Sequence, residues 1–514
     1  MIAVQSIWFN ELNDGIDYSC GWLDVRFHLF SWTLSSLLLA RHFDTCSLVS
    51  DEKGTQLVER LQLPYTRIST ELESIKRINF LWMPNKVYSY SIQQEPFVHV
   101  DIDAYLFNNL DEKLKNAPLF AQNFEYDLDT YVEAYEDIHT YFSYIPEFIK
   151  KDALGRLTAV NAGIIGGNNT QFFNELINVL NDFLEKNDAH IRKCRYTPLN
   201  IFAEQFLFKN YADAKNIPID YLTPREFGPP CDYQMADFVQ LPNDNAYVHL
   251  MNYKRNPTAC EQLAQRLWLE SPELYERVIT VCRELAATHH YVETSEAPKQ
   301  PRPFYRTLYA LQTLGLIQSD SSIAVKDVAK LIENLPDGPH KDRLIDVWQY
   351  ESSRQAYVQD LPEISANWQK WRYSSNQVNT LLAQPAATYR QAVVRRSDRC
   401  VRIESEWNWV EANEFAGQTA DRGLYDNLQT EPAYFEVLLY YYPHQKLVRE
   451  QLLDVLNILV LDTLEEPLSI EKLIESVAAQ VLSYQLQANL AELSATLLGQ
   501  IRHFLYHGIL EPVL

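Results

Sequence analysis

An apolar run at positions 96–107 contains two aspartates one residue apart, Asp101 and Asp103. The run reads as a buried strand that carries this pair to its exposed end. Carboxylates at positions i and i+2 of an extended backbone project from one side, so both can face one divalent cation. The spacing therefore predicts a metal site, and such a cation would neutralise a diphosphate. The alternative is a solvated turn, the commoner setting of Asp-x-Asp.

A second cluster begins at Asn161 and Ala162 and continues through Gly163, Gly166 and Gly167. Three of the chain's 14 glycines thus fall within five positions. A backbone without Cβ atoms can approach a ligand closely, and an Asn side chain can bridge backbone and sugar hydroxyl groups. The alternative is a strand with a bulge and a tight hairpin.

Two further groups place polar side chains among apolar ones. Glu204 and Gln205 lie within an aromatic, amphipathic helix predicted at 200–208, where an inward-facing charge needs partners. His249 ends a predicted strand, and Lys254 follows closely with a second cation, which suits phosphate oxygens. The alternatives are a solvated helix face for the first group and an ordinary core histidine for the second.

The first half of the chain alternates strand and helix patterns. Strands are predicted at 2–9 and 47–50, the second followed directly by Asp51, and helices at 30–40 and 75–89. This alternation indicates parallel βα units, whose ligands gather at the carboxyl ends of the strands. Asp51 and the Asp101 pair both fall at such ends.

Length and composition indicate an ordered protein of two or three domains. The chain has 514 residues, of which 46% are hydrophobic and 12% aromatic. Its formal charge of −23, without a basic run, argues against nucleic acid or an anionic membrane surface as a partner.

The cysteines and the hydrophobic runs bear on location. Seven scattered cysteines without a Cys-x-x-Cys spacing are typical of a reduced, cytoplasmic protein without a zinc site. No stretch reaches the length of a membrane span, and the first residues resemble a strand, with no basic segment of a signal peptide. We therefore expect a cytoplasmic protein.

The order of these motifs resembles a known family. Asp-x-Asp, then Asn-Ala-Gly-x-x-Gly-Gly, then an acid with Gln, then His with a trailing Lys is similar to nucleotide-sugar-dependent glycosyltransferases of the GT-A fold, especially the glycogenin and galactosyltransferase-like group. The segment 81–107, with Trp82 and Lys86, also resembles a related uncharacterised bacterial domain family. The resemblance covers roughly residues 1–260.

The resemblance implies a role for each motif residue. Asp101, Asp103 and His249 would bind Mn2+ or Mg2+, and Lys254 would hold the leaving diphosphate. Asp51 would contact the uracil or ribose, and Lys86 would contact the donor. Asn161, Ala162 and Gly163 would line the sugar and acceptor site, while Glu204 and Gln205 would lie near the anomeric carbon, with Glu204 as a sugar contact or base. The implied reaction is hexose transfer from a nucleotide sugar, UDP-linked by resemblance, with retention of configuration.

Two departures from the family pattern bear on these roles. His249 lacks the usual following glycine and Lys-Pro, and Glu204 stands where the family has an aspartate, one methylene shorter. The alternative function is a non-catalytic protein that kept the fold and binds a sugar nucleotide or a peptide. A nucleotidyltransferase would want a Gly-rich, cationic phosphate loop after the first strand, which 10–14 does not offer.

The second half is predicted to begin after a polar, proline-bearing linker at 293–303, which sets a first domain at 1–292. Helices are predicted over 304–385, a strand at 398–410 and a helix over 434–464. The end of the chain, 390–514, resembles a winged-helix module whose acidic balance disfavours DNA. By fold-level analogy it would hold a ribosomally made peptide, the acceptor; the alternative is an oligomerisation or purely structural domain.

Overall fold

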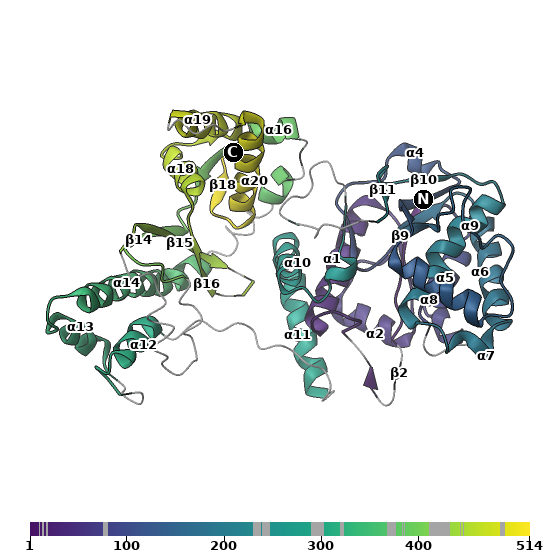
Figure 1. The fold of residues 1–514 in the computed structure, drawn as a ribbon, viewed down its shortest axis with the longest axis horizontal. Coiled ribbons are helices and arrows are strands. Elements are labelled where there is room, and N and C mark those ends of the chain that lie inside the picture. The colour runs from purple at the N-terminus through teal and green to yellow at the C-terminus, as the bar shows by residue number, and fades with distance from the viewer. Residues whose placement is uncertain are drawn as a thin grey trace. The chain divides into compact units, whose positions relative to one another are not determined.

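The computed structural model describes residues 1–9, 11–12, 15–16, 19–75, 81–229, 238, 247–288, 303–318, 323–366, 377–382, 384, 386–410, 432–442, 444–445, 447–483 and 489–513. The chain forms two compact units, Met1–Ser295 and Glu296–Leu514, and Figure 1 labels many of their elements. The predicted linker at 293–303 lies outside the described residues except for its last position.

A mixed, mostly parallel sheet forms the centre of the first unit. Its strands run in the order β10–β8–β9–β6–β1–β4–β5, and β11 also pairs with β8. The strands of this unit, including the two-stranded pairs β2–β3 and β7–β12, are β1 Ile2–Ser6, β2 Glu11–Leu12, β3 Gly15–Ile16, β4 Cys46–Val49, β5 Arg67–Ser69, β6 Phe97–Val100, β7 Ala104–Leu106, β8 Leu119–Tyr126, β9 Thr158–Gly167, β10 Ile219–Tyr221, β11 Glu226–Phe227 and β12 Tyr247–His249.

The strand order reverses direction beside β1. The chain moves outward from β1 to β4 and β5 in parallel, and then returns to β6 on the other side of β1, again in parallel. A ligand of an open α/β sheet binds at such a switch point, beyond the carboxyl ends of the strands. The Asp-x-Asp segment directly follows β6 and therefore lies at this position.

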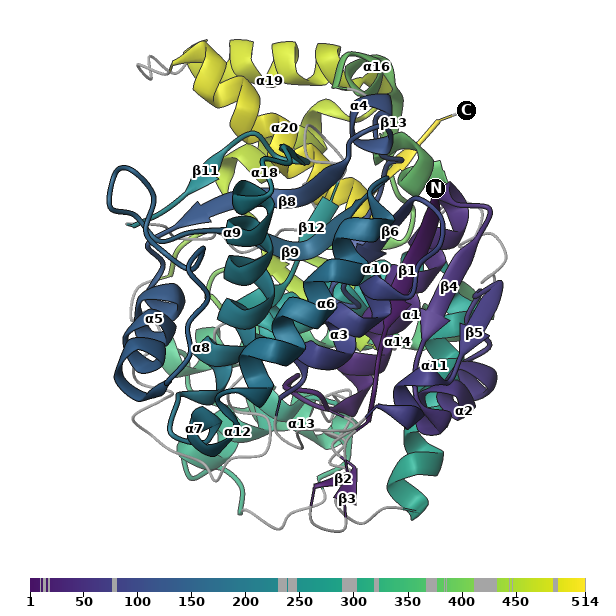
Figure 2. The ribbon, with the colours of Figure 1, turned by 90° about the vertical axis from the view of Figure 1, so that its right-hand side faces the viewer.

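Helices cover both faces of the sheet. They are α1 Val25–His42, α2 Glu52–Leu61, α3 Met83–Ser91, α4 Glu112–Lys115, α5 Asp129–Tyr141, α6 Thr170–Glu185, α7 Asp188–Ile191, α8 Tyr196–Ile201, α9 Leu207–Ala214, α10 Pro257–Glu270 and α11 Pro272–Thr288, with 3-10 turns η1 Glu71–Ser74 and η4 Met251–Tyr253 and a π-helical turn η2 Phe202–Phe206. Figure 2 shows α3, α6 and α9 in front of the sheet. Helix α1 packs on the opposite face and contacts α10 and α11.

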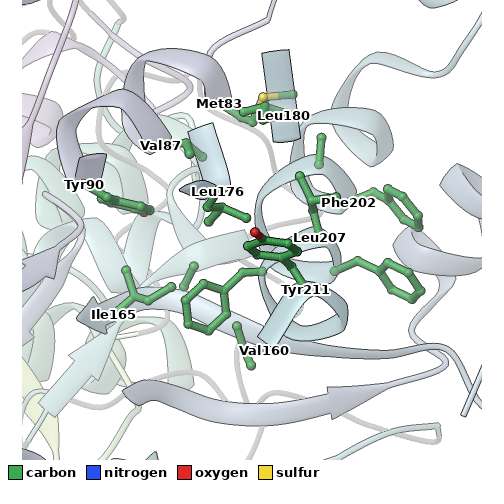
Figure 3. Close-up of a cluster of buried hydrophobic side chains, with 14 of the residues drawn as sticks. Met83, Val87, Tyr90, Val160, Ile165, Leu176, Leu180, Phe202, Leu207 and Tyr211 are labelled. Carbon is green, nitrogen blue, oxygen red and sulfur yellow. The ribbon is translucent and has the colours of Figure 1, made fainter. Parts of the chain in front are cut away.

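Successive side chains along a strand point to opposite faces of the sheet, so each face has its own hydrophobic core. Val4 and Phe97 point toward α3 and α6, whereas Ala3 and Val98 point toward α1. Figure 3 shows the larger core, where α3, α6 and α9 place side chains such as Val87, Leu176 and Tyr211 over β9. These helices hold the segments around the Asp-x-Asp turn in a close-packed setting.

The second unit contains two small sheets, with strand orders β17–β13–β18 and β14–β15–β16. Its elements are α12 Tyr305–Thr313, α13 Val325–Glu333, α14 Pro339–Ala366, α16 Ala386–Gln391, β13 Val393–Arg396, β14 Cys400–Ser405, β15 Phe435–Tyr442, β16 Leu447–Leu452, α18 Val455–Thr463, β17 Leu468–Ser469, α19 Ile470–Ser483, α20 Leu490–Tyr506 and β18 Leu510–Pro512. Helices α12–α14 share one core with β14–β16. In the described part of the chain, no helix combines the length and apolar character needed to cross a bilayer.

Two predicted helices are wrong in whole or in part. The segment 434–464 is mainly the hairpin β15–β16, and only α18 within it is helical. Strand β15 is rich in aromatic residues and buried on both faces, so it lacks the alternation that marks a half-buried strand. In the segment 75–89, the helix α3 begins only at Met83, where Pro84 occupies its first turn.

A buried charge cluster connects the helices of the second unit to its sheet. Glu450 on β16 pairs with Arg306 of α12 and Arg354 of α14, and it accepts a hydrogen bond of 2.8 Å from the Tyr350 hydroxyl group. Burial by itself would raise the pKa of Glu450, but the two guanidinium groups lower it below its ordinary value. The carboxylate therefore stays charged and compensates both buried cations.

Replacing Glu450 by Gln should strongly destabilise the second unit. The two buried guanidinium groups would lose the carboxylate that pairs with both of them, a change that costs about 3–5 kcal/mol. Differential scanning calorimetry of the full chain should show a lower unfolding temperature. The exposed Glu466 provides the control, since Glu466→Gln should leave that temperature nearly unchanged; equal effects of the two substitutions would contradict the assignment.

Candidate metal centre

The two aspartates lie in the turn that joins β6 to β7. The Asp101 N–H donates to the Gly163 carbonyl at 2.8 Å, and the Ala104 N–H donates to the Asp101 carbonyl at 2.9 Å. The Leu250 N–H donates to the Asp103 carbonyl at 3.0 Å. The pair is less exposed than the sequence indicated, because Asp103 is only 4% exposed and Asp101 is partly buried. Backbone bonds from two neighbouring segments thus fix both carboxylates.

His249 reaches the same place through a short antiparallel ladder. Strand β12 pairs with β7 so that His249 lies opposite Ala104, one residue from Asp103. The imidazole Nε2 is 3.6 Å from Asp103 Oδ1. One ligand atom from each of Asp101, Asp103 and His249 lies within 4.8 Å of the other two. The three residues predicted to bind a cation are therefore brought together.

Two lysines neutralise the aspartates. Lys86 Nζ lies 2.8 Å from Asp101 Oδ1 and 2.8 Å from Glu204 Oε1, so it bridges two carboxylates. Lys254 Nζ lies 2.8 Å from Asp103 Oδ2. The Lys86 side chain is 11% exposed, whereas that of Lys254 is 31% exposed. Three carboxylates thus face two ammonium groups, which leaves an excess of negative charge for a cation to offset.

The environment separates the pKa values of the two aspartates. Burial raises the pKa of Asp101 despite the nearby Lys86 ammonium group. For Asp103, burial acts in the same direction, but Lys254 and His249 outweigh it and lower the pKa. The Lys86 pKa is raised, because Asp101 and Glu204 outweigh the opposite effect of burial. Lys86 is therefore fully charged at neutral pH.

Glu204 lies in the π-helical turn η2 rather than in a regular helix. It is 1% exposed, and its Oε1 accepts a hydrogen bond of 2.6 Å from the Tyr90 hydroxyl group. Its Oε2 has no hydrogen-bond partner among the described residues. Burial raises the pKa of Glu204. Such turns are frequent at functional sites, and this one aims a carboxylate at Lys86.

The glycine-bearing segment forms strand β9, which has an irregularity and adjoins the acidic turn. Strand β9 is followed by helix α6 rather than by a tight hairpin. The Asn161 side-chain oxygen accepts from the Gly163 N–H at 3.0 Å, and the Gly163 carbonyl accepts from Asp101. The Ala162 carbonyl accepts a hydrogen bond of 3.3 Å from Lys86. Each of these residues thus bonds within the centre, and their predicted contacts with sugar and acceptor stay predictions.

Asp51 and Gln205 have hydrogen-bond partners outside the cluster of Asp101, Asp103 and His249. Asp51 caps α2, accepting from the Gly54 N–H at 2.8 Å and from the Phe9 N–H at 2.9 Å. These contacts serve the helix start, and a role in nucleotide binding stays a prediction. Gln205 Oε1 lies 2.7 Å from the Tyr131 hydroxyl group.

Sequence reasoning missed a row of buried polar residues on β8. Gln122, Asn123 and Glu125 are each at most 2% exposed. Gln122 contacts His249, and Glu125 accepts a hydrogen bond of 2.9 Å from Asn161. A signal for them existed, because three polar residues interrupt an apolar run at 119–126. A buried strand tolerates such residues only where they have partners.

A family model matches residues 1–281, more than half of the chain. The chain belongs to the family of unknown function DUF6734. The comparison with curated proteins gives no match. The part shared with DUF6734 contains the whole candidate metal centre, from Lys86 to Lys254, and ends within α11. The centre therefore belongs to the region that defines the family.

In this DUF6734 chain, Lys86→Met should destabilise the first unit in a pH-dependent way. Loss of the ammonium group leaves Asp101 and Glu204 buried without compensation, which costs about 3–5 kcal/mol when both are ionised. Their pKa values would then rise further above the unfolded values, so the folded variant binds more protons and its deficit shrinks as the pH falls. Thermal unfolding at pH 8 and pH 5 measures this difference.

Lys209→Met is the matched control, because Lys209 pairs with Asp213, whose side chain is 56% exposed. A pair of this kind contributes about 0–1 kcal/mol. A deficit of the Lys86 variant that is equal at both pH values would contradict the charge-compensation account.

Proposed function

We propose that the chain is a metal-dependent glycosyltransferase of the GT-A fold that transfers a hexose from a nucleotide sugar, UDP-linked by resemblance, to an acceptor. The observation that carries this proposal is the convergence of Asp101, Asp103 and His249 within 4.8 Å. These residues come from motifs far apart in the chain, in the order found in such enzymes. Their meeting at one point is what the proposal requires.

The donor set suits Mn2+ or Mg2+. Hard divalent cations prefer carboxylate oxygens, and an imidazole nitrogen is compatible with Mn2+. The cluster also has an excess of negative charge, which would otherwise be costly in a buried setting. Asp101, Asp103 and His249 would hold the ion, which when bound would neutralise the diphosphate as the glycosidic bond breaks.

We assign different roles to the two lysines. Lys254 is the more exposed of the two, and among the described residues it pairs with one carboxylate, that of Asp103, so its ammonium group can turn toward a diphosphate oxygen. There it would stabilise the negative charge that grows on the leaving group. Lys86 is held between Asp101 and Glu204, so it orients Asp101. Glu204 thereby serves as a positioning residue, and its contact with the sugar stays a prediction.

The sheet supports the same assignment. A nucleotide would lie beyond the carboxyl ends of β1, β4 and β6, at the switch point where open α/β sheets bind ligands. The antiparallel strand β9 next to β6 brings the Asn161 segment to this edge.

Nucleotide binding should require both the metal and the aspartates. Isothermal titration of UDP and of GDP into the metal-free full chain, repeated with Mn2+, should show micromolar binding of one nucleotide only when Mn2+ is present. The Asp101→Asn/Asp103→Asn variant should lose at least about 2.7 kcal/mol of binding free energy, a hundredfold in affinity. The surface variant Asp182→Asn/Asp213→Asn is the control, since both carboxylates are about half exposed.

Equal binding with and without Mn2+, or unchanged binding by the Asp101/Asp103 variant, would contradict the proposal. If neither nucleotide binds, the glycosyltransferase proposal is wrong, and the alternative of a protein that kept the fold for another purpose is left.

We further propose that the second unit binds a peptide, which serves as the acceptor or carries it. Helices α18, α19 and α20 with strands β17 and β18 support a winged-helix arrangement. A groove of about 640 Å³ lies between α14 and β14, lined by Trp348, Gln349, Ser352, Ser353, Arg402, Ile403 and Glu404. Strand β14 is at the edge of its sheet among the described strands, and an extended peptide can pair with such an edge.

Filling the groove should abolish peptide capture. Pull-down of the full chain with a short peptide encoded beside its gene should succeed for the wild type and fail for Ser352→Trp, which places an indole in the groove. Glu466→Gln, outside the groove, is the control. Capture that is unchanged by Ser352→Trp would remove the groove as the binding site.

A further inference from the structure

The His249 ring is held from behind by a buried amide. Gln122 is 2% exposed, and its Oε1 lies 3.0 Å from His249 Nδ1. The Gln122 Nε2 group donates to Asn123 Oδ1 at 3.1 Å, so the amide is oriented with its oxygen toward the ring.

The local backbone is arranged to make this contact. Across the irregularity between β8 and β9, Ala121 pairs with Ile165 and Asn123 with Asn161, so Gln122 faces three residues of β9. Such irregularities re-aim side chains next to active sites. Gly163 is the middle residue of the three, and a Cβ atom there would overlap the His249 ring and lie 2.8 Å from Gln122 Oε1. The glycine therefore leaves room for the ring and its partner.

The contact decides which ring nitrogen is available. Because the Gln122 oxygen can only accept, Nδ1 of His249 must carry the proton. In the neutral imidazole, Nε2 then has the lone pair. Nε2 is the nitrogen that lies 3.6 Å from Asp103 Oδ1, on the side of the two aspartates. The bond thus directs the lone pair toward the place where a cation would bind.

We propose that Gln122 is a positioning residue that fixes the tautomer and orientation of His249 for binding a divalent cation. This inference rests on the metal site of the proposed function. Hydrogen bonds to the second nitrogen of a ligand histidine fix its ring, and their loss typically weakens metal binding 10- to 100-fold. The side chain of Gln122 bonds to His249 and Asn123 rather than to either aspartate in the hydrogen bonds of the described residues. Gln122 therefore acts on the cation site through His249.

The test is the Mn2+ affinity of the nucleotide-free full chain, measured from the electron paramagnetic resonance signal of free Mn2+. Gln122→Met keeps the length of the side chain but removes the acceptor, and it should weaken Mn2+ binding at least about tenfold. Gln122→Glu keeps an acceptor oxygen and should bind Mn2+ at least as well as the wild type. Gln93→Met is the control, because Gln93 is also buried and its side chain donates to the Ser89 carbonyl, away from the centre.

Thermal unfolding of each variant separates positioning from folding. Weaker Mn2+ binding by a folded Gln122→Met, with retained binding by Gln122→Glu, supports the inference. Wild-type affinity in Gln122→Met, or weakened binding in a folded Gln122→Glu, overturns it and leaves the metal site in place. If Gln122→Met does not fold, weakened binding by a folded Gln122→Glu still overturns the inference. Absence of Mn2+ binding by the wild type overturns the metal site and this inference together.

Discussion

The structure around the acidic turn depends on compensation of buried negative charge. Asp101, Asp103 and Glu204 are gathered at the end of β6 in a largely dehydrated setting, where like charges repel and lose their hydration. Lys86 and Lys254 make this arrangement tolerable. The choice of side chains nearby follows from the same constraint, because each must offer a hydrogen bond or a charge to this cluster.

The backbone supplies the rigidity that such a cluster needs. The Asp101 N–H bonds to β9, and the Asp103 carbonyl bonds to the segment after β12, so the turn is held from two sides. At the irregularity in β9, the Gly163 N–H donates to the Asn161 side chain, and the Gly163 carbonyl accepts from the Asp101 N–H. A loop held only by its own residues would not keep two carboxylates together against their repulsion. The sheet therefore acts as the support of the charged centre.

The local patterns predicted the parts that depend on nearby residues. The helix predicted at 30–40 lies within α1. The resemblance to GT-A glycosyltransferases implies that Asp101, Asp103 and His249 lie together, and the structure brings them together. Features that depend on contacts between distant residues were not predicted from the sequence. The π-helical turn at Glu204 and the contact of Gln122 with His249 arise from packing between strands and helices far apart in the sequence. The helix predicted over 434–464 is wrong at strand β15, because burial of both faces of this strand removes the alternation of apolar and polar residues.

The central claim is that the acidic turn binds a divalent cation together with a nucleoside diphosphate. The most direct test is a crystal structure of the full chain with UDP and Mn2+, with diffraction data collected at the manganese absorption edge. We expect an anomalous peak within bonding distance of Asp101, Asp103 and His249 and of the diphosphate oxygens. A bound nucleotide without such a peak, or a peak elsewhere on the chain with these three side chains unligated, would contradict it.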